Sequence, residues 1–249
     1  MTKILRMLAA IWLVAAAAAT HAEVPAVSSA IQGFHTAYEL RYAGLRADAT
    51  IDLKPTETPG EYLYSVTTKT RGLARLIRPG TATEVAKFIY DHNGFRPLSY
   101  HLDDGVPKEE NDSDVQFDWA KGTAVCRHES QTVELQIQVG MLDRLTSDIV
   151  AIQSLRDGRP LGEFDVVDRN EIQRYEFTPQ GEETIKVPAG TFKTIKYLRG
   201  KPGSSRATMI WFAPDAAYLP VKLAQLKRGK STVEMYATVL EPAAAPAPR

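Results

Sequence analysis

The chain has 249 residues, and its 30 lysines and arginines balance 30 aspartates and glutamates, so the formal net charge at pH 7 is zero. No basic block is present to match a phosphate backbone, which argues against nucleic acid as a partner. Cys126 is the only cysteine, so no disulfide can form within one chain. A chain of this length buries enough apolar surface to fold without cross-links.

The first 22 residues have the pattern of a secretory signal peptide. Lys3 and Arg6 precede an apolar run, Met7 to Ala19, and the small residues of Thr20-His21-Ala22 flank a cleavage point. This run is shorter than the roughly 20 residues that span a bilayer, and no second run of that length follows. We therefore expect cleavage near Ala22, a periplasmic location and no transmembrane segment in the mature chain. Residues 23–33 are expected to form a spacer.

Alternation of apolar and polar residues predicts antiparallel strands from residue 34 onward. Phe34–Tyr42 and Leu45–Lys54 form a predicted hairpin around Ala43-Gly44, and Glu61–Lys69 forms a third strand. Helical spacing interrupts this pattern at Arg71–Ile77, where one or two short helical turns are predicted.

The strand pattern then resumes. Two predicted strands flank Asn93-Gly94, a pair typical of tight turns. The acidic segment Asp103–Asp114 is predicted as an exposed loop, since it lacks the spacing of a calcium loop. Cys126 alternates with Ala124 and His128 on a later short strand, which favours a small buried side chain. An intermolecular disulfide or a reactive thiol is the alternative.

One long amphipathic helix is predicted at Leu142–Arg156, with Asp143 in its first turn and Asp157-Gly158 at its end. Its apolar stripe must be buried, most simply against the sheet. Further strands follow at Glu163–Val167, Glu171–Phe177 and Glu183–Val187. After the Pro188-Ala189-Gly190 turn, the remaining strands run to Leu240 and close the sheet.

About a dozen strands and one long helix predict a mainly β fold. A flat sheet of that size leaves long edges and cannot bury one face, so the sheet must curl. We expect a single domain over residues 34–240, a curved antiparallel sheet forming a β-roll or open barrel with the amphipathic helix packed on it. Residues 241–249, rich in alanine and proline, are expected to be a disordered tail.

No motif indicates catalysis. No Gly-x-Ser-x-Gly occurs, and the histidines after residue 22 are scattered without metal-ligand spacing, so we expect no catalytic, cofactor or metal residues. For an envelope hydrolase, Asp118 is the best single carboxylate. Alternation places Asp118 opposite Phe117 and Trp119, which favours an exposed or locally hydrogen-bonded role. Asp215 is better explained as a turn former.

Aromatic residues are the remaining group of candidate site residues. Their side chains either fill the core or line a concave apolar cavity. Adjacent Trp211 and Phe212 point to opposite faces of their strand, so one of them lies outside the core. Together with Tyr218 and Trp119, this pair is the predicted surface for a hydrophobic ligand or a partner.

The chain resembles an exported bacterial family, domain of unknown function 3108. The resemblance spans about residues 34–240 and rests on the order of five short segments, which are Tyr38–Gly44, Phe117–Trp119, Gly140–Leu145, Val187–Phe192 and Trp211–Asp215 with Tyr218–Val221. It implies an exported, β-rich protein and supplies no catalytic residues. At the level of fold alone, the build is similar to envelope proteins that carry lipids or lipoproteins in a half-barrel.

Three functions follow as hypotheses. The leading one is a non-enzymatic periplasmic protein that binds a hydrophobic, lipid-like ligand or an envelope partner in or on a curved sheet. The alternative is a structural or assembly factor of the cell envelope, with a filled core, that acts through its outer surface or a sheet edge. An envelope hydrolase is the third.

Overall fold

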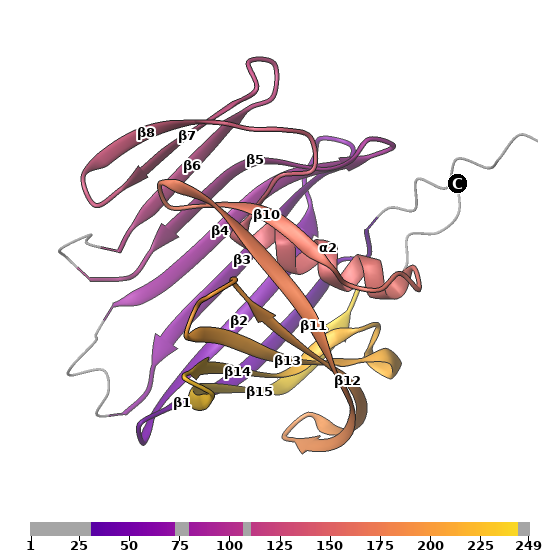
Figure 1. Cartoon of the computed structure of the whole chain (residues 1–249). Coiled ribbons are helices and arrows are strands. Elements are labelled where there is room, and N and C mark those ends of the chain that lie inside the picture. The colour runs from indigo at the N-terminus through magenta and orange to yellow at the C-terminus, as the bar shows by residue number, and fades with distance from the viewer. Residues whose placement is uncertain (1–30, 73–79, 107–110, 244–249) are drawn as a thin grey trace, which may run out of the picture.

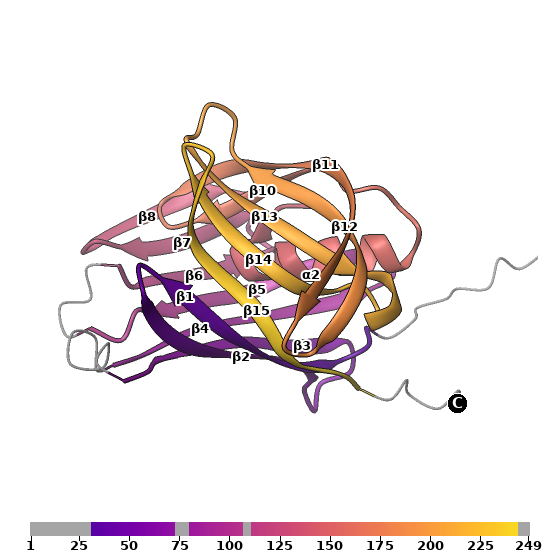
Figure 2. The same ribbon diagram turned by 90° about the horizontal axis from the view of Figure 1, so that it is seen from below.

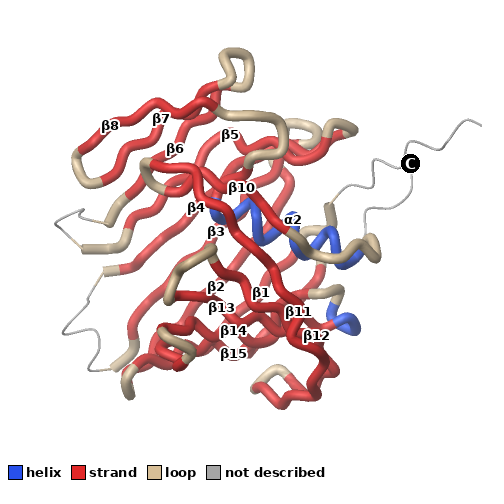
Figure 3. The backbone as a smooth tube through the Cα atoms, in the orientation of Figure 1, coloured by secondary structure: helices blue, strands red, loops and turns tan. Residues whose placement is uncertain are grey.

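A computed structural model of the chain describes residues 31–72, 80–106 and 111–243 (Figure 1). Strands dominate this part of the chain, and α2 is the one long helix within it (Figure 3). The strands are β1 (Phe34–Tyr42), β2 (Leu45–Pro55), β3 (Glu61–Thr70), β4 (Thr81–Asp91), β5 (Gly94–Asp103), β6 (Ser113–Asp118), β7 (Thr123–His128), β8 (Gln131–Gln136), β9 (Leu142–Asp143), β10 (Glu163–Asp168), β11 (Glu171–Val187), β12 (Gly190–Gly200), β13 (Arg206–Ala213), β14 (Leu219–Lys227) and β15 (Lys230–Pro242). The helices are α2 (Arg144–Arg156) and the short 3₁₀ turn η1 (Pro214–Ala216).

All strands belong to one sheet of 15, in the order β8-β7-β6-β5-β4-β3-β2-β1-β15-β14-β13-β12-β11-β10-β9. Strands that are neighbours along the chain pair with one another, except β8 and β9, and the first strand pairs with the last, so Phe34 lies opposite Pro242. Every pairing is antiparallel except that of β9 with β10. The sheet thus consists of two meanders joined through β1 and β15, with β8 and β9 at its edges.

The sheet curls so that its two halves face each other, and α2 lies between them (Figure 2). Helix α2 contacts β4 and β5 of one half and β10 of the other. The predicted mainly β fold, an open curved sheet with one helix packed on it, is confirmed.

The alternation of apolar and polar residues decides which side chains of each strand face the interior. In β1 the residues Phe34, Thr36 and Tyr38 are buried, whereas Tyr42 at the strand end is exposed. The inner residues of β3, Tyr62 and Tyr64, are also buried, as the period of two predicts.

Helix α2 begins one residue after Asp143. The sequence predicts Asp143 in the first turn of the helix, but Asp143 is the N-cap. The Asp143 side chain accepts hydrogen bonds from the backbone N–H groups of Leu145 (2.8 Å) and Thr146 (2.9 Å). These bonds satisfy donors that have no partner within the helix, which is why the helix starts at this point. Gly158, with φ +70°, follows the last turn, so the predicted end of the helix is confirmed.

Strand β11 is one strand of 17 residues, where the sequence predicts two. Its pairing with β12 shifts register between Pro179 and Glu182. A bulge lets a strand tolerate proline, which has no N–H for the ladder, so β11 continues through Pro179.

The ordered domain extends beyond its predicted borders at both its N-terminal and its C-terminal end. Ile31, assigned to the spacer, is buried, and its N–H donates to the Tyr62 hydroxyl (3.0 Å). Strand β15 runs to Pro242, two residues beyond the predicted end at Leu240. The signal peptide, residues 73–77 of the predicted helical turns and residues 244–249 lie outside the described residues.

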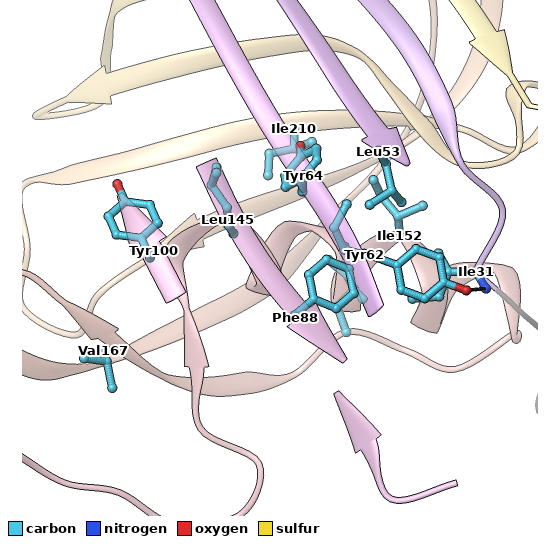
Figure 4. Close-up of a cluster of buried hydrophobic side chains, with 14 of the residues drawn as sticks. Ile31, Leu53, Tyr62, Tyr64, Phe88, Tyr100, Leu145, Ile152, Val167 and Ile210 are labelled. Atoms are coloured by element: carbon cyan, nitrogen blue, oxygen red, sulfur yellow. Dashed lines mark hydrogen bonds between the residues drawn. The ribbon is translucent and has the colours of Figure 1, made fainter. Parts of the chain in front are cut away.

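The largest buried cluster joins the inner faces of both halves to α2 (Figure 4). Phe88 is fully buried and stacks on Tyr62, with ring centroids 5.6 Å apart. Leu145 and Ile152 of α2 pack into the same cluster, opposite residues such as Ile210. The apolar stripe of the helix is therefore buried in the concavity of the sheet, as its periodicity requires.

Candidate functional site

Side chains do not fill the whole concavity of the sheet. An inner cavity of about 200 Å³ lies among β1, β13, β14 and the first half of α2. Its walls are mainly apolar and include Leu40, Ile51, Val66, Ile152, Ile210 and Phe212. Period-two alternation in the strands and helical spacing in α2 bring these side chains to one interior face.

Polar and charged side chains also line the inner cavity, among them Thr36, Tyr38, Glu84 and Asp148. Tyr38 is buried, and its hydroxyl donates to the Pro220 carbonyl oxygen (2.7 Å). Burial raises the pKa of Tyr38, so it stays a neutral donor at physiological pH. The Thr36 hydroxyl is also buried and makes no hydrogen bond of normal geometry with any described residue.

An outer cavity of about 650 Å³ adjoins the inner one and shares Arg144, Arg199, Thr208 and Gln225 with it. It lies where β1, β12 and β14 end and where β13 and β15 begin. Its charged side chains are all cations: Arg144, Arg199, Lys201, Arg206 and Lys227. The two cavities therefore differ in character, one mainly apolar and the other basic.

Three carboxylates behind the outer cavity pair with three of its cations. Arg144 Nη2 lies 3.3 Å from Glu84 Oε1. Arg199 pairs with Asp148 of α2, and Lys201 Nζ lies 3.8 Å from Asp168 Oδ2. These are the charged groups where the two halves of the sheet and the helix meet.

Two tyrosines complete this network. Tyr100 donates to Glu84 (3.1 Å), and Tyr175 donates to Asp168 (3.2 Å). The Arg199 guanidinium also lies over the Tyr175 ring, 5.5 Å from its centroid. Glu84 of β4 and Asp168 of β10 thus each have both a cation and a hydroxyl as partners. Charged groups in a protein interior require such partners.

Burial and neighbouring charges shift the pKa values of Arg144, Tyr175 and Lys201. The Glu84 carboxylate raises the pKa of Arg144, and burial raises the pKa of Tyr175 to about 12. Burial lowers the pKa of Lys201, while Asp168 opposes that shift. Arg144 lies deep in the fold, yet 34% of its side chain is exposed, because it faces the cavities. A permanently charged guanidinium is therefore available to a ligand.

Arg206 and Lys227 have no carboxylate partner among the described residues. The outer cavity has five cations, and three carboxylates pair with them: Glu84, Asp148 and Asp168. Two positive charges therefore remain in excess at the outer cavity. Such an arrangement attracts an anion.

The four aromatic residues predicted as a ligand or partner surface lie in different places. Phe212 is 2% exposed and lines the inner cavity. Trp211 lies on the opposite face of β13, where its Nε1 donates to Glu183 (3.1 Å) and the Lys222 ammonium sits 4.7 Å from its ring. The predicted opposition of these two side chains is confirmed.

Tyr218 follows η1 in a left-handed conformation (φ 58°) and packs against the main core. Trp119 lies after β6, where it stacks on Phe117 and donates from Nε1 to the Pro97 carbonyl oxygen (2.6 Å). Of the four predicted residues, Phe212 alone lines the inner or the outer cavity.

The charged residues of the cavities were not predicted as a site. A signal for them exists in the alternation pattern, since Glu84 shares the inward register of Ala86 and Phe88 in β4. Asp148 likewise lies three residues after Leu145, beside the apolar stripe of α2. A charged residue on an otherwise apolar face marks an interior polar site, but its partner cannot be read from spacing.

The carboxylates considered for hydrolysis lie elsewhere. Asp118 is half-buried at the end of β6, accepts from the Lys121 N–H (3.0 Å) and pairs with its ammonium (2.8 Å). These bonds lower its pKa. Asp215 lies in η1, and neither residue lines the inner or outer cavity. The two candidates thus lack the shared cleft that hydrolysis requires.

In the acidic segment, the carboxylates of Asp103, Asp104 and Asp112 lie within 4.8 Å of one another. The N–H of Asp104 donates to Asp112 (2.9 Å), and Asn111 donates to Asp104 (2.9 Å). Local hydrogen bonds therefore account for this cluster. Cys126 is fully buried in β7, as predicted, and burial raises the pKa of its thiol to about 11.

These features define a strongly curved antiparallel sheet that encloses one helix and an apolar cavity with a basic mouth. The chain belongs to the family described as "Protein of unknown function (DUF3108)", whose model matches residues 37–238. No protein with a curated description matches the chain. Among the described residues, none forms a helix long and apolar enough to cross a membrane.

The solved structures that match this chain share little sequence with it. A β-barrel-like protein of domain of unknown function DUF1849 from Brucella abortus is 9% identical, with a TM-score of 0.53 over 85% of this chain and 98% of that one. MucB is 12% identical, with a TM-score of 0.39, and the match covers 89% of this chain and 57% of MucB. The complex of MucB with MucA(peri) gives a TM-score of 0.33. The DUF1849 structure thus supports the fold, at an identity that says nothing of function.

Proposed function

We propose that this protein is a non-enzymatic, periplasmic protein of the cell envelope that binds a hydrophobic, lipid-like ligand in the inner cavity. The observation that carries the proposal is an interior volume of about 200 Å³ with mainly apolar walls. Protein interiors are normally packed without voids much larger than a water molecule. An apolar cavity of about 150 Å³ is already large enough to bind benzene or xenon.

A variant that fills the cavity tests the proposal. Thr208 lines both cavities, and Thr208→Trp places an indole at their junction. Met209→Trp on the opposite face of β13 is the matched control. Calorimetric titration of delipidated protein with decanol and decanoate should show binding to the wild type and to Met209→Trp, and at least about tenfold weaker binding to Thr208→Trp. No binding to the wild type would contradict the proposal.

A second candidate is the binding of an envelope partner at a sheet edge. Strand β8 is an edge of the sheet, its burial is low, and only β7 pairs with it. An exposed edge offers backbone hydrogen bonds to an added strand. A photo-crosslinker at Glu134 should then capture one defined envelope protein that the same crosslinker at Lys193 does not capture. Equal labelling at both positions would count against this candidate.

A further inference from the structure

Three cations form a row across neighbouring strands, and two of them, Arg206 and Lys227, line the outer cavity. Arg206 of β13 lies directly opposite Lys227 of β14, and Lys227 lies directly opposite Lys230 of β15. Directly opposed side chains on antiparallel strands have Cβ atoms only about 5 Å apart, and like charges there repel. None of these three residues forms an ion pair with another described residue. We call these three residues the cation row.

The cation row adjoins the charged side chains deeper in the outer cavity. Arg206 and Lys227 line this cavity together with Lys201, Arg199 and Arg144. The deeper cations have carboxylate partners, whereas those of the row do not. An anion at the mouth would relieve the repulsion within the row without breaking an existing ion pair.

The basic mouth leads to the apolar cavity. Arg144, Arg199, Thr208 and Gln225 line both cavities, so a ligand that passes these residues has its charged end near the row and its chain among apolar side chains. At about 200 Å³, the inner cavity is large enough for part of an acyl chain. The rest of a medium-length chain would extend through the outer cavity.

We infer that the ligand is an anionic amphiphile, whose carboxylate or phosphomonoester group binds at the cation row while its acyl chain enters the inner cavity. This inference rests on the proposed function and specifies the headgroup. Charge complementarity selects the anion, because the excess of two positive charges lies at the mouth. The adjoining apolar walls favour an amphiphile over a free inorganic anion, which gains nothing from the inner cavity.

The test compares ligands that share a chain and differ in charge. Decanoate, decyl phosphate, decanol and inorganic phosphate are titrated into the delipidated full-length protein by calorimetry at low ionic strength. Decanoate and decyl phosphate should bind at least about tenfold more tightly than decanol. This preference should shrink between about 0.01 and 0.15 M salt, as the Debye length falls from about 30 to 8 Å.

Variants locate the headgroup. Arg206→Gln with Lys227→Gln removes two exposed cations of the row, and neither change touches the core. Lys186→Gln with Lys193→Gln is the matched control, since these lysines are also exposed and line neither cavity. The row variant should bind decanoate about as weakly as decanol, and the control should bind both like the wild type. Retained circular dichroism and melting temperature show that each variant folds.

The outcomes separate the two ideas. Equal affinity for decanoate and decanol, unchanged in the row variant, would overturn the anionic headgroup and leave hydrophobic binding supported. An affinity for inorganic phosphate equal to that for decyl phosphate would also overturn the amphiphile. Absence of binding by every chain-bearing ligand would overturn the proposed function and this inference with it. A charge preference that persists in the row variant would show that the headgroup binds elsewhere.

Discussion

The cation row should destabilise the free protein, and this can be measured without any ligand. Lys227→Glu converts two repulsive cross-strand pairs, with Arg206 and Lys230, into two attractive ones. At about 0.3–0.5 kcal/mol per exposed pair, removing two repulsions gains about 0.6–1 kcal/mol, and adding two attractions doubles that gain. Lys227→Glu should therefore raise the free energy of unfolding by about 1–2 kcal/mol, and Lys227→Gln by about half as much.

Thermal unfolding followed by circular dichroism is the assay. For a protein of this size, 1 kcal/mol corresponds to about 2–4 °C, so Lys227→Glu should melt roughly 2–8 °C above the wild type at low salt. The gain should shrink in about 1 M salt, where the Debye length is about 3 Å. Lys193→Glu, which lies opposite Thr184, is the control for a change of charge alone.

Stability and binding should respond to this substitution in opposite directions. Lys227→Glu should be more stable than the wild type and bind decanoate less tightly. If Lys227→Glu is no more stable than Lys227→Gln at low salt, the three cations do not repel one another as their register implies. An anion at the mouth would then relieve no repulsion within the cation row.

Three further predictions concern the scaffold. Phe88→Ala should lower the free energy of unfolding by about 3–5 kcal/mol in urea titrations, because Phe88 is fully buried and stacks on Tyr62; a loss below about 1 kcal/mol would contradict this packing. Burial raises the pKa of Asp143 to about 6, so the folded state holds its proton more tightly than the unfolded state. The protonated Asp143 carboxyl stabilises the folded state below about pH 4, and this stabilisation is lost as the pH rises to about 6. The free energy of unfolding of Asp143→Asn should therefore rise by about 3 kcal/mol relative to that of the wild type over that range. A constant difference between the two proteins would refute this. The Cys126 thiol, fully buried with a pKa of about 11, should react with thiol reagents in urea but not in the native protein; rapid native labelling would show that it is accessible.

Period-two alternation was a reliable guide to individual strands. The opening hairpin and the inward positions of Tyr62 and Tyr64 follow from local patterns of apolar residues. The end of α2 at Gly158 follows from the conformational freedom of glycine. Two local features differ from the prediction. Strand β11 continues through a bulge at Pro179 where the sequence predicts two strands, and Asp143 caps α2 where the sequence predicts it in the first turn.

The candidate site required distances between residues far apart in the chain. Arg206, Lys227 and Lys230 look like ordinary surface cations in the sequence, and only the register of β13, β14 and β15 places them in one row. Glu84 and Arg144 are 60 residues apart and meet because α2 lies inside the curl of the sheet.

The sequence by itself thus determined a mainly β protein, the alternation of its strand faces and one buried helix, because these depend on the period of apolar residues along the backbone. It also determined that Trp211 and Phe212 face opposite ways. Only the tertiary structure decided that Phe212 lines a cavity while Trp211 lies on the outer face. The curvature of a 15-stranded sheet sets how much space side chains must fill, and that curvature arises from all the strand pairings together.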